Sequence, residues 1–571
     1  MCASQVSFVT PSRTVQVHLP DGRVLQGPRG ACAAEFLKPV LDTLPAPVVG
    51  VILNGELHEL TYPVVLESFL EPVTMKDSDG MRIYRRSLTF LLETAFSSLF
   101  EGVVLVIDHS VSSGGYYCHI EGRPPLSRDE LMTLQNEMKR LVEADLPYER
   151  REMPISEAIA FFEQENYPDK VSLMRYRRKP YVTLYNVGEH IDYHHGYMAP
   201  STGYIKWFAL LPAEGGFTLR FPQRRDPTTI TPMEDYPKLL TAFRQYGDWL
   251  EKLGIDNVGA LNGALEAGRS REVILVSEAL HEQHISSIAQ QIAANHDQVR
   301  VILISGPSSS GKTTFSRRLA VQLLALGLSP YALELDSFFV DRDSTPRDED
   351  GNFDFEALEA LDLDQLADHL TRLLRGDEVQ LPRYDFKAGK QVQGDVIRLR
   401  NDQLIIMEGI HGLNPRLIPP PLAGQAFRIY ASCLTQLNLD RHNRVSTTDT
   451  RLIRRIVRDT YERGYSAQQT IRRWESVRRG EELHIFPYQE NADVMFNSAL
   501  AYELSVLGPI VEPLLRQVSL GTPEFRETKR LLAFLEWFKP VETEMIPDNS
   551  ILREFIGGSI LKDFKVWGTA G

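Results

Sequence analysis

The stretch VRVILISGPSSSGKTTFSRRLAVQLLALG (residues 299–327) decides the fold of the C-terminal half of the chain. Residues 299–305 form an uninterrupted apolar run, which is typical of a buried parallel strand. Residues 306–314 follow at once and match the pattern GxxxxGK[ST], and the next residues have the composition of a helix. Strand, glycine-rich loop and helix therefore occur in the order that a phosphate-binding loop has. A glycine-rich turn that arose by chance would not need a strand before it and a helix after it.

The residue types of this loop have a physical reason. Glycines let the backbone curl so that successive N–H groups face phosphates at the positive end of a helix. We expect Lys312 to neutralise the β- and γ-phosphates and the hydroxyl of Thr313 to ligate Mg²⁺. The predicted ATP-binding residues of the loop are Gly306, Ser308, Ser309, Ser310, Gly311, Lys312, Thr313 and Thr314.

Two carboxylates follow the next apolar strands. Asp336 ends the strand-like run SPYALELDSFF (329–339), and Glu408 ends QLIIMEGIHGL (403–413). In a parallel sheet both would emerge at the carboxyl edge, beside the phosphate-binding loop. One could hold Mg²⁺ while the other accepts the proton of an attacking hydroxyl, although each alone could be a helix cap or a turn. This pair favours a kinase over a motor or a GTPase.

A basic helical segment, residues 449–480, stands out in an acidic chain. Arg451, Arg454, Arg455 and Arg458 are spaced as one helix face. Three interpretations are open: a mobile lid that closes arginines over the transferring phosphoryl group, a solvated surface, or an RNA-binding patch. We favour the lid because the segment follows a phosphate-binding loop.

The C-terminal half resembles the uridine–cytidine kinase and phosphoribulokinase branch of P-loop kinases. The resemblance covers most of residues 298–500 and rests on GPSSSGKTT, LELDSFF, GNFDFEAL, LPRYDFKAGK, IIMEGIHGL, DTRLIRRIVRD and ERGYSAQQ, in this order. It implies a nucleoside kinase that uses ATP and Mg²⁺ to phosphorylate a 5′-hydroxyl. It also implies residue roles: Asp336 as the base with Lys312 as the catalytic cation, Thr313 and Glu408 as metal ligands, Asp354, Phe339, Tyr384, Arg451 and Gln469 as substrate contacts, and Arg454, Arg455 and Arg458 as phosphate contacts.

One position departs from this family. The nucleoside kinases usually carry a histidine after YDF that reads the pyrimidine base, whereas this chain has Gly389 there. The sequence therefore predicts the ribose and phosphate machinery but leaves the base open.

The first 225 residues resemble part of threonyl-tRNA synthetase. VHLPDGRVLQ and ILNGELHEL resemble its TGS domain, and MKDSDGMRIYRRSLTFLLETAFSSLF resembles the start of its editing domain. The HxxxH of that domain is replaced by Arg86 and Phe90, which argues against surviving editing of mischarged tRNA because neither residue offers a lone pair. Its CxxxH aligns with His190 and His194 in GEHIDYHHG, for which a polar pocket is favoured over a ligand or RNA-end site and over a metal or catalytic site.

We expect an α/β multidomain fold. The predicted segments are a TGS-like β-grasp domain (13–75), an editing-like α+β domain (76–225), a helical connector (226–297), a P-loop kinase domain with a parallel sheet (298–515), and a C-terminal helix with a docking tail (516–571).

Composition limits the remaining functions. The chain has 571 residues, a net charge of −14 and four cysteines without a CxxC pair. No apolar run reaches the roughly 18 residues that span a membrane, and no signal peptide is recognised, so we expect a cytoplasmic protein without a membrane partner. The predicted partner is a nucleoside substrate, with an RNA or small-molecule effector at the N-terminal domains and a homo-oligomer left open. The alternative function is an RNA-associated regulator that uses the phosphate-binding loop as a nucleotide switch.

Overall fold

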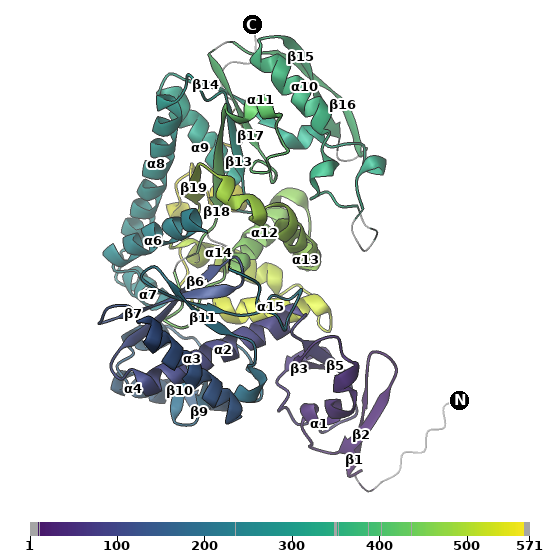
Figure 1. The fold of residues 1–571 in the computed structure, drawn as a ribbon, viewed down its shortest axis with the longest axis vertical. Helices are drawn as coiled ribbons and strands as arrows, with labels where there is room; N and C mark the ends of the chain where they lie inside the picture. Colours follow the sequence, from purple (N-terminus) through teal and green to yellow (C-terminus); the bar gives the residue numbers. More distant parts are fainter. Residues whose placement is uncertain are drawn as a thin grey trace. The chain divides into compact units, whose positions relative to one another are not determined.

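The computed structural model describes residues 10, 12–233, 236–347, 351, 353–385, 388–400, 402–435 and 437–564. Figure 1 labels its helices and strands. The chain divides into two compact units, and neither is continuous in sequence. Unit 1 contains Met1–Glu234, Leu439–Arg444 and Ser519–Phe534, and unit 2 contains Asp235–Asn438, Val445–Val518 and Leu535–Gly571. This division is coarser than the five predicted segments, whose boundaries stay predictions.

Unit 1 begins with a small mixed sheet of order β2-β1-β5-β3-β4. The sheet pairs β1 with β5 in parallel and its other neighbours antiparallel, and Phe36 of a short helix lies in its core with Val17 and Val51. Asn54 and Gly55 both have positive φ, as a type I′ hairpin turn requires. The β-grasp prediction is confirmed. The elements are β1 (Thr14–His18), β2 (Val24–Pro28), α1 (Ala33–Leu37), β3 (Val48–Leu53), β4 (Glu56–His58) and β5 (Ser68–Thr74).

The second part of unit 1 is built around the long helix α2 (Ser78–Leu99). Leu91 of this helix shares one core with Ile107, Leu134 and Tyr185, which come from a four-stranded sheet, a covering helix and a three-stranded sheet. The sheets have the orders β11-β12-β7-β6 and β10-β9-β8. The other elements are β6 (Val104–Val111), β7 (Gly115–Glu121), α3 (Arg128–Glu143), β8 (Glu149–Pro154), α4 (Ile155–Gln164), α5 (Pro168–Arg175), β9 (Tyr181–Val187), β10 (His190–Tyr193), β11 (Ala209–Ala213) and β12 (Gly216–Arg220).

Unit 2 has a five-stranded parallel sheet of order β14-β17-β13-β18-β19. All five residues of the central strand β13 (Val301–Ser305) are buried, as its uninterrupted apolar sequence predicts. The other strands are β14 (Ser329–Glu334), β17 (Gln403–Glu408), β18 (Ala426–Ser432) and β19 (Val494–Asn497), and a separate hairpin is formed by β15 (Glu378–Asp385) and β16 (Lys390–Arg398). The parallel sheet confirms the predicted fold class.

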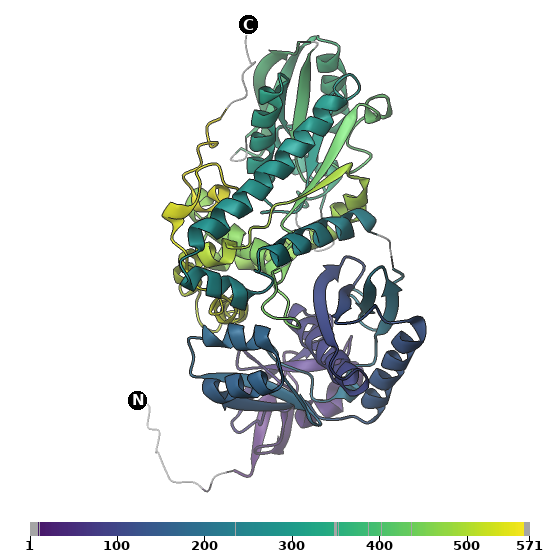
Figure 2. The same cartoon turned by 90° about the vertical axis from the view of Figure 1, so that its left-hand side faces the viewer.

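Helices surround this sheet. The long helix α8, which faces the viewer in Figure 2, packs along α9, and Arg318 of α9 donates to Glu282 of α8 over 2.7 Å. None of the helices in the described residues is long and apolar enough to cross a membrane. The helices of unit 2 are α6 (Pro237–Lys252), α7 (Val258–Glu266), α8 (Ser270–Ala294), α9 (Lys312–Ala325), α10 (Leu363–Leu374), α11 (Pro420–Ala423), α12 (Thr447–Arg463), α13 (Ala467–His484), α14 (Glu503–Leu515) and α16 (Arg553–Ile556).

Unit 1 is completed by a late segment of the chain. Helix α15 (Pro523–Leu535) supplies Glu527, whose carboxylate accepts hydrogen bonds from Arg82 of α2 over 2.9 and 3.2 Å and from Arg530 over 2.6 Å. Burial opposes the ionisation of Glu527, but Arg530 and Arg82 hold the pKa of its carboxyl below the usual range. The predicted C-terminal helix therefore has a fixed place in unit 1.

We expect Glu527→Gln to lower the free energy of unfolding of unit 1 by about 1–3 kcal/mol at pH 7, because it leaves two partly buried arginines without their shared carboxylate. The depressed pKa also sets a pH dependence. The stabilisation is complete above the ordinary glutamate pKa of 4.5 and is lost as the pH falls through the lower native value. Urea unfolding at pH 7 and pH 4, followed by circular dichroism, should therefore show a smaller difference between wild type and variant at pH 4.

Glu137→Gln is the matched control, since Glu137 pairs with Arg140 within one helix and the arginine is 65% exposed. We expect this change to cost less than about 0.5 kcal/mol. Equal losses from the two variants would contradict a special role for Glu527.

Candidate active site at the phosphate-binding loop

The phosphate-binding loop joins the central strand β13 to helix α9. Ser309 and Gly311 take left-handed φ values of 57° and 83°, which curl the backbone before the helix begins. A Cβ atom at Gly306 would lie 1.9 Å from the carbonyl oxygen of Ala431, so this position accepts glycine alone. The predicted strand, loop and helix are therefore present with the close packing that their glycines allow.

Lys312, Thr313 and Glu408 lie together where β17 ends. Thr313 Oγ1 donates to Glu408 Oε1 over 3.0 Å, and Lys312 Nζ donates to the carbonyl oxygen of Pro307 over 3.0 Å. Burial raises the pKa of Glu408 to about 7, against the effect of Lys312, and burial lowers the pKa of Lys312. A hydroxyl beside a carboxylate suits Mg²⁺, which takes few protein ligands and oxygen atoms only.

Asp336 lies at the same edge of the sheet. Glu334 pairs with Glu408 in the register of β14 and β17, and Asp336 follows two residues later in the short 3₁₀ helix Leu335–Phe338. Desolvation by the surrounding protein atoms and the charge of Glu334 raise the pKa of Asp336, whereas Lys312 and Arg463 lower it. The Asp336 side chain is exposed and lies within electrostatic reach of the loop lysine, as a general base open to an incoming hydroxyl beside a phosphoryl donor would be.

The predicted arginine face lies on α12, but its members have different surroundings. Arg451 and Arg454 are 1% and 0% exposed. Arg451 pairs with Glu481 and donates to the Ser308 carbonyl over 2.9 Å, while Arg454 donates to Glu503 over 2.6 Å. Both arginines are therefore buried in ion pairs next to the loop. They form neither a solvated surface nor an RNA-binding patch.

Arg455 and Arg458 have different partners from Arg451 and Arg454. Arg455 Nη1 donates to the Ser308 hydroxyl over 2.8 Å, and Arg458 contacts Asp459 at 3.2 Å. Helix α12 ends at Gly464, whose φ is 70°, and the preceding Arg463 acts electrostatically on Asp336. Arg455 therefore touches the loop directly, Arg458 acts electrostatically on Lys312, and Arg463 acts on Asp336.

Two carboxylates accept hydrogen bonds from backbone N–H groups in and just after the loop. Glu481 Oε1 accepts from the N–H of Ser308, and Glu554 Oε2 accepts from the N–H of Thr314, both over 3.0 Å. Ile551 of the same C-terminal tail packs against Gly311, where an added Cβ would come within 2.6 Å of its Cγ2. The C-terminal tail therefore packs on the phosphate-binding loop.

The predicted acceptor residues form an aromatic and acidic group. The rings of Phe339 and Tyr384 have centroids 5.6 Å apart, and Phe355 lies 6.4 Å from Phe339. Asp354 Oδ1 accepts from the N–H of Glu356 over 3.0 Å, and its Oδ2 lies 3.7 Å from His484 Nε2. The ring planes of Tyr384 and Phe355 are inclined by 57° and 82° to that of Phe339, and such an aromatic cluster with a carboxylate can hold a ring compound with hydroxyl groups.

Two other positions have local roles. Gln469, expected to contact substrate, forms the capping box of α13: its Oε1 accepts from the N–H of Ser466 over 2.9 Å. Gly389 has φ of 67°, and an added Cβ would lie 2.8 Å from the guanidinium of Arg342. The neighbouring Phe386 and Lys387 lie outside the described residues. A side chain at position 389 would therefore need both a strained backbone and a displaced arginine.

The editing-like pocket of unit 1 is filled by the replacements that the sequence identified. Arg86 donates to the carbonyl oxygen of Tyr197 over 2.5 Å and covers Gly196. The ring of Phe90 has its centroid 5.5 Å from that of His190 and 4.9 Å from that of His194. His190 and His194 thus both pack on the ring of Phe90.

Sequence reasoning missed Arg463, Glu356, Glu481 and Glu554 at the loop. Burial and Glu481 raise the pKa of Glu356 to about 7, so this carboxyl lies in the same buried group. Arg463 lies within the quoted ERGYSAQQ and could have been included, whereas the position of Glu554 has no local signal because it depends on how the tail docks.

The residues present fit a bound nucleotide with its metal. The hydroxyls of Ser309 and Ser310 are buried without a hydrogen-bond partner among the described residues, and such orphaned donors are unfavourable unless a ligand accepts from them. Lys312 adds a cation at the same place, and Thr313 with Glu408 provides the oxygen pair described above. The loop therefore offers both the donors and the metal ligands that a nucleoside triphosphate needs.

Comparison with known proteins agrees with this geometry. Residues 301–504 match the family model "Phosphoribulokinase / Uridine kinase family". The N-terminal region is similar to threonine–tRNA ligases: that of Thermotoga petrophila is 32% identical over 205 residues, which are 36% of this chain and 31% of that protein. The ligase of Symbiobacterium thermophilum is 31% identical over 207 residues, 36% of this chain and 32% of that protein. The match thus spans about a third of these relatives.

Two solved structures are also similar to part of the chain. One is a possible uridine kinase from Bacillus stearothermophilus, 22% identical, covering 38% of this chain and 98% of that chain with a TM-score of 0.27. The other is a putative fructose transport system kinase from Silicibacter sp. TM1040, 18% identical, covering 37% and 98% with a TM-score of 0.26. Residues 301–504 match the Phosphoribulokinase / Uridine kinase family model, and the N-terminal region is similar to part of the threonine–tRNA ligases.

Proposed function

We propose that the protein transfers the γ-phosphoryl group of ATP to the 5′-hydroxyl of a nucleoside, giving a nucleoside monophosphate and ADP. The observation that carries this proposal is the place of the Asp336 carboxylate, two residues after the paired Glu334 and Glu408 at one edge of the sheet and within electrostatic reach of Lys312. A nucleotide switch needs a phosphate-binding loop but no proton acceptor of this kind, whereas transfer to an alcohol needs one.

The residues of this chain would divide the work as follows. The acceptor oxygen forms a bond to the γ-phosphorus as the bond from that phosphorus to the bridging oxygen of ADP breaks, and the hydroxyl proton passes to Asp336. Lys312 and the arginines near the loop stabilise the negative charge on the phosphoryl oxygens. Thr313 and Glu408 would hold Mg²⁺, which when bound neutralises phosphate charge. Glu408, with its pKa of about 7, would be held ionised by that cation.

The residues predicted to bind the acceptor favour a nucleoside over an open-chain sugar phosphate. The neighbouring rings of Phe339 and Tyr384 offer a stacking surface for a base, and the Asp354 carboxylate can accept hydrogen bonds from ribose hydroxyls. Gly389 offers no side chain to read the base edge, so we propose broad acceptance of bases.

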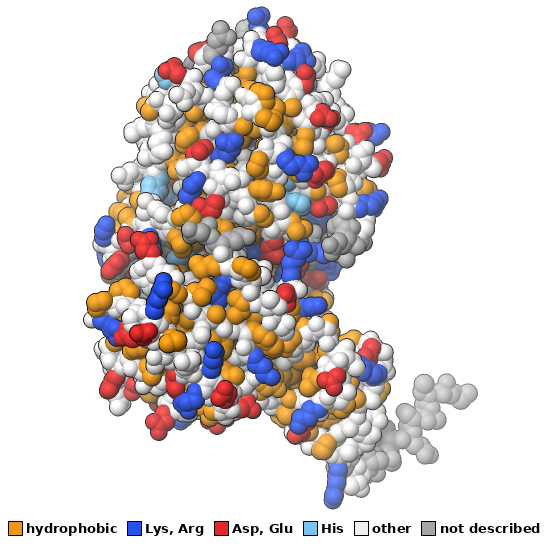
Figure 3. All heavy atoms as spheres, viewed as in Figure 1, with side chains coloured by type: hydrophobic (Ala, Val, Ile, Leu, Met, Phe, Trp, Pro, Cys, Tyr) orange, Lys and Arg blue, Asp and Glu red, His pale blue; other side chains and the backbone are white. Residues whose placement is uncertain are grey.

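The alternative, an RNA-associated regulator, has less support. Acidic and basic side chains are interspersed over the face shown in Figure 3, and Arg451 and Arg454 are buried. An RNA-binding surface would instead need exposed basic side chains gathered along one path.

Asp336→Asn should lower kcat by roughly 10²–10⁴-fold, because the amide cannot accept the hydroxyl proton. ATP affinity should change little, since the amide keeps the size of the side chain. Coupled ADP-release kinetics and calorimetric ATP titration measure the two effects. Asp364→Asn, at an exposed residue of α10, is the control and should keep full turnover; near-normal turnover in Asp336→Asn would reject Asp336 as the base.

A panel of acceptors tests the substrate class. We expect monophosphates from several ribonucleosides with Mg-ATP, detected by liquid chromatography, and no product from ribulose 5-phosphate or fructose. If only a sugar acceptor gives product, the protein is a kinase but its substrate is not a nucleoside. ATP binding without any product across the panel would favour the switch.

Glu554→Gln should tighten ATP binding by up to about tenfold, equivalent to ~1.4 kcal/mol. The carboxylate accepts from the N–H of Thr314, in the region where phosphates would bind, so its negative charge opposes theirs. Calorimetric titration with ATP measures the change, and Glu544→Gln at an exposed residue of the same tail should leave affinity unaltered. Weaker ATP binding in Glu554→Gln would mean that the carboxylate supports the loop instead.

A further inference from the structure

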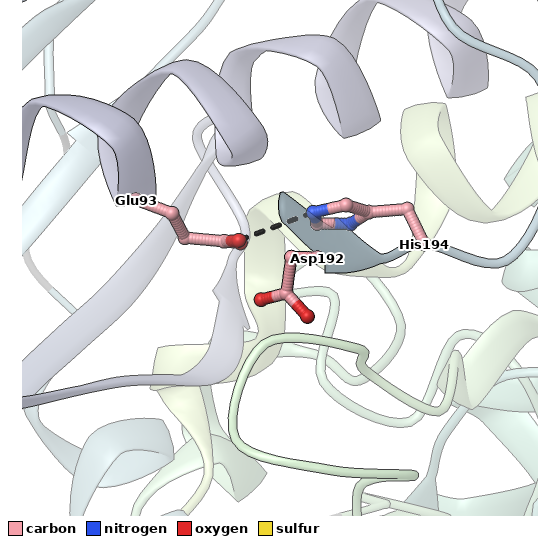
Figure 4. Close-up of side chains that lie close together, drawn as sticks. All are labelled: Glu93, Asp192 and His194. Carbon is pink, nitrogen blue, oxygen red and sulfur yellow. Dashed lines mark hydrogen bonds and ion pairs between the residues drawn. The ribbon is translucent and has the colours of Figure 1, made fainter. Parts of the chain in front are cut away.

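Unit 1 contains a buried group of metal-binding side chains that the phosphoryl-transfer chemistry does not use. Figure 4 shows Glu93 of α2 facing Asp192 of β10 and His194, which follows that strand. His442, from the segment Leu439–Arg444, lies beside them. These four residues are 2%, 1%, 3% and 6% exposed, so the group is shielded from solvent.

The ligand atoms are spaced as in a small coordination shell. His194 Nε2 lies 3.1 Å from Glu93 Oε2, and His442 Nδ1 lies 3.4 Å from the same oxygen and 2.8 Å from Asp192 Oδ2. One ligand atom each of Glu93, Asp192 and His194 falls within 4.8 Å of the others. A tetrahedral ion with bonds of about 2.0–2.1 Å keeps its ligand atoms roughly 3.3 Å apart. A small shift of the side chains would therefore accommodate such an ion.

The carboxylates around this buried group outnumber the cationic side chains that face them. Lys170 Nζ lies 2.8 Å from Asp192 and 3.3 Å from Asp440, so one ammonium faces these two carboxylates and that of Glu93 nearby. The neighbouring Asp169 and Arg441 pair with each other. With neutral histidines, the three carboxylates and one ammonium leave two negative charges in a buried space, which is unfavourable unless protons or a cation compensate them.

One oxygen of the group has no internal partner. Glu93 Oε1 is buried and accepts no hydrogen bond from the described residues. The carboxylate most in need of a cation is therefore the one that faces both histidines.

The surrounding contacts hold His442 in place. Asp440 accepts from the backbone N–H groups of His442 and Asn443, each over 2.9 Å, and Asn443 Nδ2 donates to the carbonyl oxygen of Tyr193 over 2.8 Å. Such outer contacts orient ligands in known metal sites. The segment is thus fixed against β10 by bonds that do not involve the proposed ligand atoms.

We propose that Glu93, Asp192, His194 and His442 bind one divalent transition-metal ion of the zinc class. Two imidazole nitrogens with two carboxylates favour zinc over Mg²⁺ or Ca²⁺, which prefer oxygen ligands alone. Asp192 and His442 are 250 positions apart in the sequence, so the ion cross-links distant parts of unit 1. Its role is structural, because the four protein ligands leave no open position for a reacting water.

The test uses the purified full-length chain, stripped with EDTA and dialysed. Titration with Zn²⁺ should give one bound ion per chain by elemental analysis and should raise the melting temperature. Co²⁺ in place of Zn²⁺ should give the visible absorption of a four-coordinate site. Absence of stoichiometric Zn²⁺ binding by the wild-type protein, or a Co²⁺ spectrum of a six-coordinate ion, would overturn the proposal without any variant.

Variants then identify the ligands. His442→Ala and the isosteric Glu93→Gln should each weaken Zn²⁺ binding by roughly 100-fold or more, since even loss of an outer contact costs 10–100-fold. His190→Gln is the matched control: this histidine lies in the same strand as Asp192, its Nδ1 is 3.4 Å from the Ser97 hydroxyl, and it is not one of the four proposed ligands. Unchanged Zn²⁺ affinity in His442→Ala, or loss of binding in His190→Gln instead, would overturn the assignment. Circular dichroism confirms that each variant is folded, and the wild-type Co²⁺ spectrum decides the question if one is not.

Discussion

The backbone N–H groups of the phosphate-binding loop are the constraint on which unit 2 depends. A loop curled around a site for phosphate leaves its donors without the partners that a helix or sheet would supply. Glu481 and Glu554 accept from two of these donors, and Arg451 balances the charge of Glu481. Helix α13 and the C-terminal tail are thereby fixed around one short loop.

The same loop explains why the arginine helix is buried. Arg454 links the carbonyl oxygen of Ser498 to the carboxylate of Glu503, so it spans from the end of the sheet to the start of α14. A guanidinium can do this because it offers five donors in a fixed plane. The arginines near the phosphate site therefore have two kinds of surroundings. Arg451 and Arg454 are buried and support the loop, whereas Arg455 bonds to the hydroxyl of Ser308.

Local motifs predicted the fold class, and they place several of the candidate site residues at one edge of the sheet. The strand, loop and helix around Lys312 could be predicted because all three are contiguous, and Asp336 and Glu408 because each ends an apolar strand. Gln469 was given a substrate role by resemblance, whereas its capping box depends on the neighbouring Ser466. Glu554 and His442 could not be predicted, since their partners lie far away in sequence and only tertiary packing brings them together.

The discontinuity of both units has a consequence for synthesis on the ribosome. Unit 1 lacks His442 and helix α15 until the chain has been made through residue 534, by which time most of unit 2 has emerged. N-terminal domains ordinarily fold first during translation, but here the first domain stays incomplete until almost the end. The buried Lys170 and Asp192 gain their partners Asp440 and His442 only after that later segment has been made. The two units must therefore reach their final structures nearly together.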